Sequence, residues 1–132
     1  MYVYYCDHFE LPLPNGHRFP INKYQLAREP VVNNFSDHIV LQVADAATRD
    51  QLIRVHSSDY VDRVFEGKLT ELEQKRIGFP WSPKMLERSR RSVGATIAAS
   101  HKATEYGVAA HLSGGTHHAF AEEGQGYCVF ND

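Results

Sequence analysis

Hydrophobic and polar positions follow two different periods along the chain, and together they predict a mixture of strands and helices. The opening run MYVYY is aromatic and β-branched, which predicts a short strand that enters the interior. Residues 7–20 contain three prolines and an Asn-Gly pair and are therefore expected to form a loop. A helix is expected from Ile21 to Glu29, because Pro30 disfavours its continuation. The run HIVLQVA, residues 38–44, predicts a second strand.

Helical signals are clearest in the middle of the chain. In SSDYVDRVFEG a serine cap precedes an apolar face, Gly67 ends the helix, and the apolar face consists of Tyr60, Val61, Val64 and Phe65. Residues 68–76 are polar and indicate a solvated helix or a loop. The longest helix is predicted from Pro83 to Tyr106, because Ser82 can cap its start and Gly107 can end it. Its many small residues favour close packing against another backbone.

The stretch after this helix indicates where a ligand site should lie. Residues 108–112, VAAHL, are apolar without polar alternation, which is typical of a parallel strand covered on both faces. A helix, a buried strand and a glycine-rich loop in this order are typical of an α/β sheet. In such sheets ligands bind beyond the carboxyl ends of the strands. The loop SGGTHHAFAEEGQGYCVFND, residues 113–132, begins at that position.

Composition narrows the class of protein. A chain of 132 residues is long enough for one domain with a core, and its net charge of −2 without a basic patch disfavours nucleic-acid binding. No stretch has the length of a membrane span. Cys6 and Cys128 are too few for a disulfide framework, and the N-terminus lacks the pattern of a secretory signal. We therefore expect a cytoplasmic protein with reduced thiols.

Two adjacent histidines are the strongest chemical signal in the sequence. Neighbouring side chains of a strand point to opposite faces, so His117 and His118 can serve one site only where the backbone is irregular. Gly114 and Gly115 permit such a backbone. Histidine takes up and releases protons near neutral pH, so one imidazole could accept a proton from water while the other stabilises charge. Considered without their context, two loop histidines bonded to the backbone are the simpler alternative.

The segment LSGGTHHAFAEEGQGYCVFND resembles the tandem-histidine segment of the histone deacetylase superfamily. HSSDYVDRV, IGFPWSP and GHRFP are similar to further segments of that family, so the resemblance spans nearly the whole chain. GFPWSP is more similar to bacterial and class IV members, including those named for acetoin utilisation, than to class I members. The resemblance implies the N-terminal part of a three-layer α/β/α arginase/deacetylase-like fold with a mainly parallel sheet. Residues 1–132 would form a single partial domain.

The same resemblance implies roles for individual residues. His118 would act as general base and acid, and His117 would position or polarise the zinc-bound water or stabilise charge. Gly126 would accept a hydrogen bond from the substrate amide through its carbonyl, and Tyr127 would form the aromatic wall of an acyl-lysine tunnel. Arg18 would line an internal channel through which acetate could leave. The residues themselves leave open that Tyr127 is a core side chain and that Arg18 is a surface ion-pair partner.

Two departures from the family pattern limit these expectations. Pro80 stands where class I relatives place a rim aspartate that binds the substrate backbone. The Zn²⁺ ligands of the family, an Asp-x-His pair and a later aspartate, come downstream of Asn-Asp together with the transition-state tyrosine, so this chain should contain no metal ligands. The other histidines lack zinc-site spacing, and His101 and His111 are expected to be packed or hydrogen-bonded. A cysteine hydrolase using Cys128 with a neighbouring histidine is a minor alternative.

The resemblance implies that the chain is the N-terminal part of a zinc-dependent deacetylase, an amidohydrolase that removes acetyl or other short acyl groups from acyl-lysine or another primary amine. The chain alone is expected to be inactive. The alternative from another class is a non-enzymatic truncated fragment that acts by self-association or protein interaction. Because the strand at residues 108–112 would leave an unpaired sheet edge, a homo-oligomer is expected.

Overall fold

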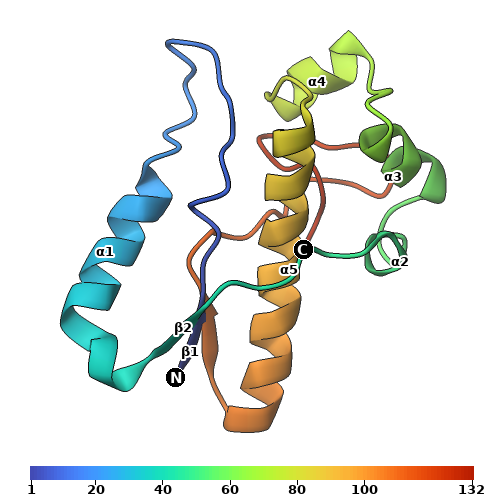
Figure 1. Ribbon diagram of the computed structural model, residues 1–132. Coiled ribbons are helices and arrows are strands. Elements are labelled where there is room, and N and C mark those ends of the chain that lie inside the picture. Colours follow the sequence, from blue (N-terminus) through green and yellow to red (C-terminus); the bar gives the residue numbers. More distant parts are fainter.

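The computed structural model describes all residues from 1 to 132 and shows a small parallel sheet with helices around it (Figure 1). The strands are β1 (Tyr2–Tyr4), β2 (Val40–Gln42) and β3 (Ala109–His111). The helices are α1 (Lys23–Phe35), α2 (Arg49–Leu52), α3 (Ser58–Phe65), α4 (Glu71–Ile77) and α5 (Pro83–Tyr106), and a 3₁₀ turn, η1 (Ser36–His38), joins α1 to β2. No helix is long and apolar enough to cross a membrane.

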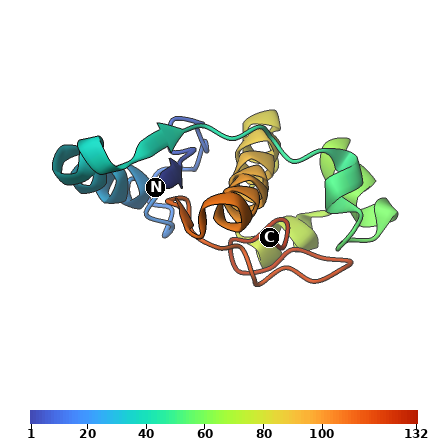
Figure 2. The same ribbon diagram turned by 90° about the horizontal axis from the view of Figure 1, so that it is seen from below.

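The sheet confirms the predicted α/β class. Its strand order is β2-β1-β3, and both neighbouring pairs are parallel, with Val3 opposite Leu41 on one side and Ala110 on the other. In both views the strands lie between α1 and α5, and α2, α3 and α4 lie beyond α5 (Figures 1 and 2). A parallel sheet with a helix on either side is the arrangement that right-handed crossover connections produce.

Local signals placed the two best-delimited helices correctly. Ser82 accepts a hydrogen bond from the backbone of Met85 at 3.0 Å, and α5 runs from Pro83 to Tyr106 as predicted. The Ser57 side chain caps α3 in the same way. The polar segment at residues 68–76 contains α4, which has a capping box at its start and ends at Gly78 with a φ of 88°.

Two predictions about the elements were wrong. Helix α1 does not stop before Pro30 but continues to Phe35. A proline inside a helix removes only one backbone donor, and α1 has no buried residue, so water can reach the carbonyl that loses its partner. Strand β3 is half-buried rather than covered on both faces, because it lies at the edge of the sheet and α5 is the helix that packs against it.

The main core lies where α3, α4 and α5 meet the C-terminal loop. Tyr60, Ile77 and Met85 are fully buried in it, and the Tyr60 hydroxyl donates to the carbonyl of Val129 at 2.8 Å. Helix α5 also approaches the segment after β2 very closely, since a Cβ on Gly94 would lie 1.8 Å from the carbonyl oxygen of Asp45. The small residues of α5 therefore permit a backbone contact, as the sequence predicts.

Candidate active site

The loop that follows β3 brings the two adjacent histidines together. The ring centroids of His117 and His118 are 4.2 Å apart, and both side chains are exposed. The loop is irregular, with Gly114 at a φ of 75°, which a side chain would rarely allow. The two imidazoles can therefore serve a single site, although they are neighbours in the sequence.

The final two residues hold this loop by its backbone. Asp132 accepts a hydrogen bond from the Thr116 N–H at 2.7 Å and another from the Thr96 hydroxyl of α5 at 2.7 Å. The Asn131 amide donates to the carbonyls of Ala119 at 2.8 Å and His117 at 3.3 Å. Sequence reasoning included Asn-Asp in the motif but assigned it no role. The available signal was that Asn and Asp side chains commonly bond to loop backbone.

His56 supports the same loop from the segment before α3. Its ring is buried, and its Nε2 accepts the backbone N–H of Asn131 at 2.9 Å. The ring also packs against Tyr60 and Phe130, each with centroids 5.6 Å away. Burial lowers the pKa of His56, so the neutral imidazole needed to accept this hydrogen bond is favoured.

Gly126 and Tyr127 form a tight turn that is anchored on the end of α4. The N–H groups of Gly126 and Tyr127 donate to the carbonyls of Arg76 and Ile77, at 3.1 Å and 2.6 Å. Tyr127 has a φ of 66°, which is uncommon for a residue with a side chain, and strained backbone of this kind clusters at functional sites. A Cβ on Gly126 would lie 3.5 Å from the Cβ and Cγ of His118, so this turn lies directly against that histidine.

The Tyr127 ring is partly exposed and belongs to an aromatic group. Its centroid is 5.0 Å from that of Phe19, 5.3 Å from that of Phe79 and 6.0 Å from that of His17. A Cβ on Gly78 would lie 2.8 Å from Cε1 of Tyr127, so the ring packs directly over that glycine. The side chain is 38% exposed, which argues against the simple alternative of a core residue.

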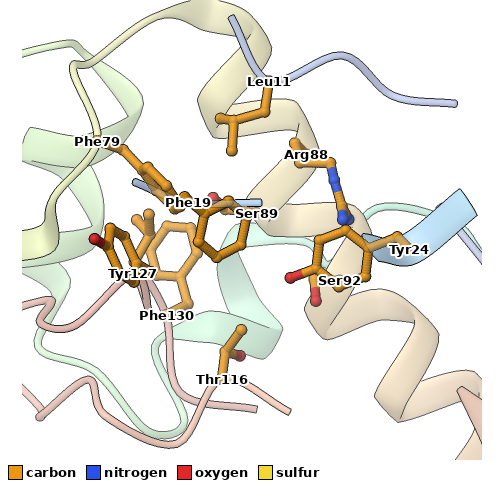
Figure 3. A pocket seen from close by; sticks show the side chains of 11 residues that line it. Leu11, Phe19, Tyr24, Phe79, Arg88, Ser89, Ser92, Thr116, Tyr127 and Phe130 are labelled. Atoms are coloured by element: carbon orange, nitrogen blue, oxygen red, sulfur yellow. The ribbon is translucent and has the colours of Figure 1, made fainter. Parts of the chain in front are cut away.

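A cavity of about 40 Å³ has Tyr127 and Thr116, the residue directly before the tandem histidines, in its lining, although neither histidine lines it (Figure 3). Five of its eleven lining residues are aromatic, namely Phe19, Tyr24, Phe79, Tyr127 and Phe130, and its polar lining comprises Arg88, Ser89, Ser92 and Thr116. Arg18, predicted to line a channel, is exposed and is not among the lining residues. Arg88 of α5 lines the cavity instead, and sequence reasoning did not select it. The available signal was its position three residues after Met85 and seven before Ala95, on one helix face.

The other candidate groups do not join the two imidazoles as catalytic partners. Cys128 is buried, and burial raises the pKa of its thiol, which does not favour a thiolate nucleophile. His111 is packed as predicted, with Nδ1 3.1 Å from the Thr96 hydroxyl, and burial lowers its pKa to about 4. His101 is exposed on α5, so the expectation that it is packed or hydrogen-bonded was wrong.

A zinc site is not assembled by this chain. No three side chains of His, Cys, Asp or Glu are grouped where they could hold a metal ion. Catalytic zinc normally has three protein ligands and structural zinc four. Residues 1–132 therefore do not fit a zinc ion by themselves.

Several curated proteins are similar to this chain along its length. An uncharacterized protein of Picosynechococcus sp. is 39% identical over 98% of the chain and 43% of its own length. The acetoin utilization protein AcuC of Bacillus subtilis is 30% identical over 99% of the chain and 35% of its own length. Histone deacetylase 2 of Arabidopsis thaliana is 36% identical over 65% of the chain and 24% of its own length. The chain thus spans less than half the length of these relatives.

The fold and the family model agree with these similarities. The crystal structure of the HDA15 HD domain superposes with a TM-score of 0.74 over 98% of this chain and 40% of its own, at 16% identity, which shows a common fold. The model of the histone deacetylase domain matches residues 17–132, which include the tandem histidines and the turn beside them. The chain therefore belongs to the histone deacetylase family.

Proposed function

We propose that this chain supplies the tandem-histidine part of a deacetylase catalytic domain, which hydrolyses acyl groups on lysine or another primary amine. One observation carries the proposal. The imidazoles of His117 and His118 lie 4.2 Å apart on a loop that Asn131 and Asp132 fix by its backbone. Two proton-exchanging groups held side by side are suited to amide hydrolysis, in which a proton leaves water and another reaches the amine.

The neighbouring turn supports a division of roles. His118 lies against Gly126, so we assign it the proton transfer, while His117 stabilises the charge that develops at the reacting carbonyl. The Gly126 carbonyl accepts the hydrogen bond of the substrate amide. The Tyr127 ring, fixed by the turn and packed over Gly78, forms an apolar wall for the acyl chain or the lysine methylenes.

Zinc dependence is part of the proposal for the complete enzyme, but no step is assigned to the metal here. The two histidines are not a ligand set, and residues 1–132 offer no other. We propose that the zinc ligands lie outside these residues and that the chain alone is inactive. The relatives, more than twice as long as this chain, are consistent with that arrangement.

The direct test is substitution of the proposed general base. In the complete enzyme, His118→Ala should lower kcat for an acetyl-lysine amide by about 10²-fold, the scale of a lost proton-transfer group. His38→Ala is a matched control, because His38 lies exposed in η1 and should leave kcat unchanged. Near-normal turnover of His118→Ala would show that the proton-transfer role has been assigned to the wrong residue.

A second candidate function is self-association. Strand β3 lies at one edge of the sheet, and the residues just before it expose large apolar surface, Tyr106 by 54% and Val108 by 55%. An unpaired strand edge beside apolar side chains is a common pairing surface. A fragment without enzymatic activity could act through this edge.

A further inference from the structure

Arg88 is the one charged side chain that lines the cavity, and it has no acidic partner. The residue is 5% exposed and forms none of the ion pairs of the chain. Its contacts are a hydrogen bond from Nη1 to the thiol of Cys6 and the ring of Tyr24, whose centroid is 4.7 Å from the guanidinium carbon. Arg28 and Arg91, by contrast, pair with carboxylates. A buried arginine without a carboxylate is unusual.

Two polar atoms of the cavity lining also have no hydrogen-bond partner. They are Nε of Arg88 and Oγ1 of Thr116, and both are buried. Native structures rarely leave buried polar atoms unpaired, so each such atom requires an explanation. An unpaired donor on a buried cation suits an anion that accepts hydrogen bonds, and the Thr116 hydroxyl is a second unpaired polar group elsewhere in the same lining.

The size and orientation of the cavity indicate which anion fits. Its volume of about 40 Å³ is roughly three times what one water molecule requires, which matches the three heavy atoms of a carboxylate. Figure 3 shows Arg88 and Tyr24 at one end of the cavity and Phe79 and Tyr127 at the other. An acyl chain that passes the Tyr127 ring would therefore have its far end directed toward the guanidinium.

We propose that Arg88 forms a carboxylate subsite and that the preferred substrate carries an acyl chain ending in a carboxylate, such as a malonyl or succinyl group. The guanidinium pairs with the terminal carboxylate through its unpaired Nε. Arg88 is then a specificity-determining residue. The proposal rests on the proposed function, because the acyl-amine site must be the one beside Tyr127.

Binding of matched ligands to this chain tests the subsite without catalysis. Calorimetry would compare lysine amides that carry Nε-succinyl, its neutral succinamoyl counterpart and Nε-acetyl. Succinyl should bind at least about tenfold more tightly than succinamoyl, the ratio expected for hydrogen bonds to a charged group. Arg88→Met should remove that ratio, and Arg88→Lys should keep part of it. Arg91→Met is the control, because Arg91 pairs with Glu87 and does not line the cavity.

Each other outcome is informative. The proposal would be overturned if the succinyl and succinamoyl ligands bind with equal affinity. It would also be overturned if the ratio of their affinities is unchanged in Arg88→Met. Free acetate that binds through Arg88 without a succinyl preference would show that the cavity accepts a free monocarboxylate, which also overturns it. Free succinate that binds through Arg88 while no acyl-lysine ligand binds would keep the subsite and count against the proposed function. If the unmodified chain shows the ultraviolet absorption band of a thiolate and Cys6→Ser removes it, then Cys6 is the anionic partner of Arg88. That result would overturn the carboxylate subsite.

Discussion

Acid should destabilise this chain through His111, which lies at the carboxyl end of β3 directly before the tandem-histidine loop. Burial lowers the pKa of His111 from 6.5 to about 4, and Arg88 adds to this effect while Asp132 opposes it. The folded chain therefore binds fewer protons than the unfolded chain between these two pKa values. Stability from the neutral imidazole is present above pH 6.5 and is lost as the pH falls toward 4.

The magnitude follows from the two pKa values. Lowering the pH from about 7 to about 5 should reduce the free energy of unfolding by about 2 kcal/mol through His111 alone. His56, whose pKa burial also lowers, should add to this loss in the same direction. The assay is urea unfolding at both pH values, with the free energy obtained by linear extrapolation.

Substitution of His111 isolates its contribution. His111→Asn keeps a polar group near the Thr96 hydroxyl but does not titrate, so the pH-dependent loss should be smaller than in the wild type by about 2 kcal/mol. His38→Asn, at an exposed ring, should leave the wild-type pH dependence unchanged. If His111→Asn and the wild type lose the same stability between the two pH values, the buried neutral histidine is not the cause.

Three further predictions follow from the site and the packing. The chain with added zinc should not hydrolyse an acetyl-lysine amide above background and should bind zinc weakly, without a thermal shift; nanomolar affinity by calorimetry would contradict the absence of a ligand set. The chain should form a homo-oligomer whose apolar interface buries more than about 1,000 Å². Light scattering after size exclusion should therefore give a molar mass above that of one chain, and a stable monomer would exclude pairing through β3. Gly124→Ala should cost about 2 kcal/mol or more in urea unfolding, because its Cβ would lie 2.6 Å from the Tyr60 hydroxyl; Gly115→Ala, where the nearest atom is 3.8 Å away, is the control.

Elements with local signals could be predicted from the sequence, and those set by distant contacts could not. Helix α5 has its cap at Ser82 and its terminating glycine at Gly107, so its bounds follow from neighbouring residues. The end of α1 does not, because the destabilisation by Pro30 depends on whether water reaches the helix backbone, and α1 has no fully buried residue. The half-burial of β3 likewise depends on which strands and helices flank it.

In the candidate site, too, some residues could be predicted from neighbouring residues in the sequence, and others depend on contacts between distant segments. The glycines and histidines of the loop after β3 are contiguous, so their resemblance to the family segment could be recognised and His117 and His118 chosen as candidates. Arg88 lies within the basic run RSRR of a long helix, where a solvated cation is the usual expectation. It is buried because Cys6, Tyr24 and Thr116 meet α5 at that turn, and the only local sign of this is that Arg88 shares a helix face with Met85 and Ala95.

The supports of the histidine loop explain why distant segments resemble the family as well as the loop itself. His56 bonds to the backbone of Asn131, Tyr60 bonds to the carbonyl of Val129, and the end of α4 bonds to the turn at Gly126. These groups contact the segment that positions the imidazoles rather than the imidazoles themselves. A substitution at any of them changes the geometry of the site without removing a reacting group. For that reason we expect substitutions in the segments around His56 and Gly78 to impair the site as well as substitutions of the tandem histidines.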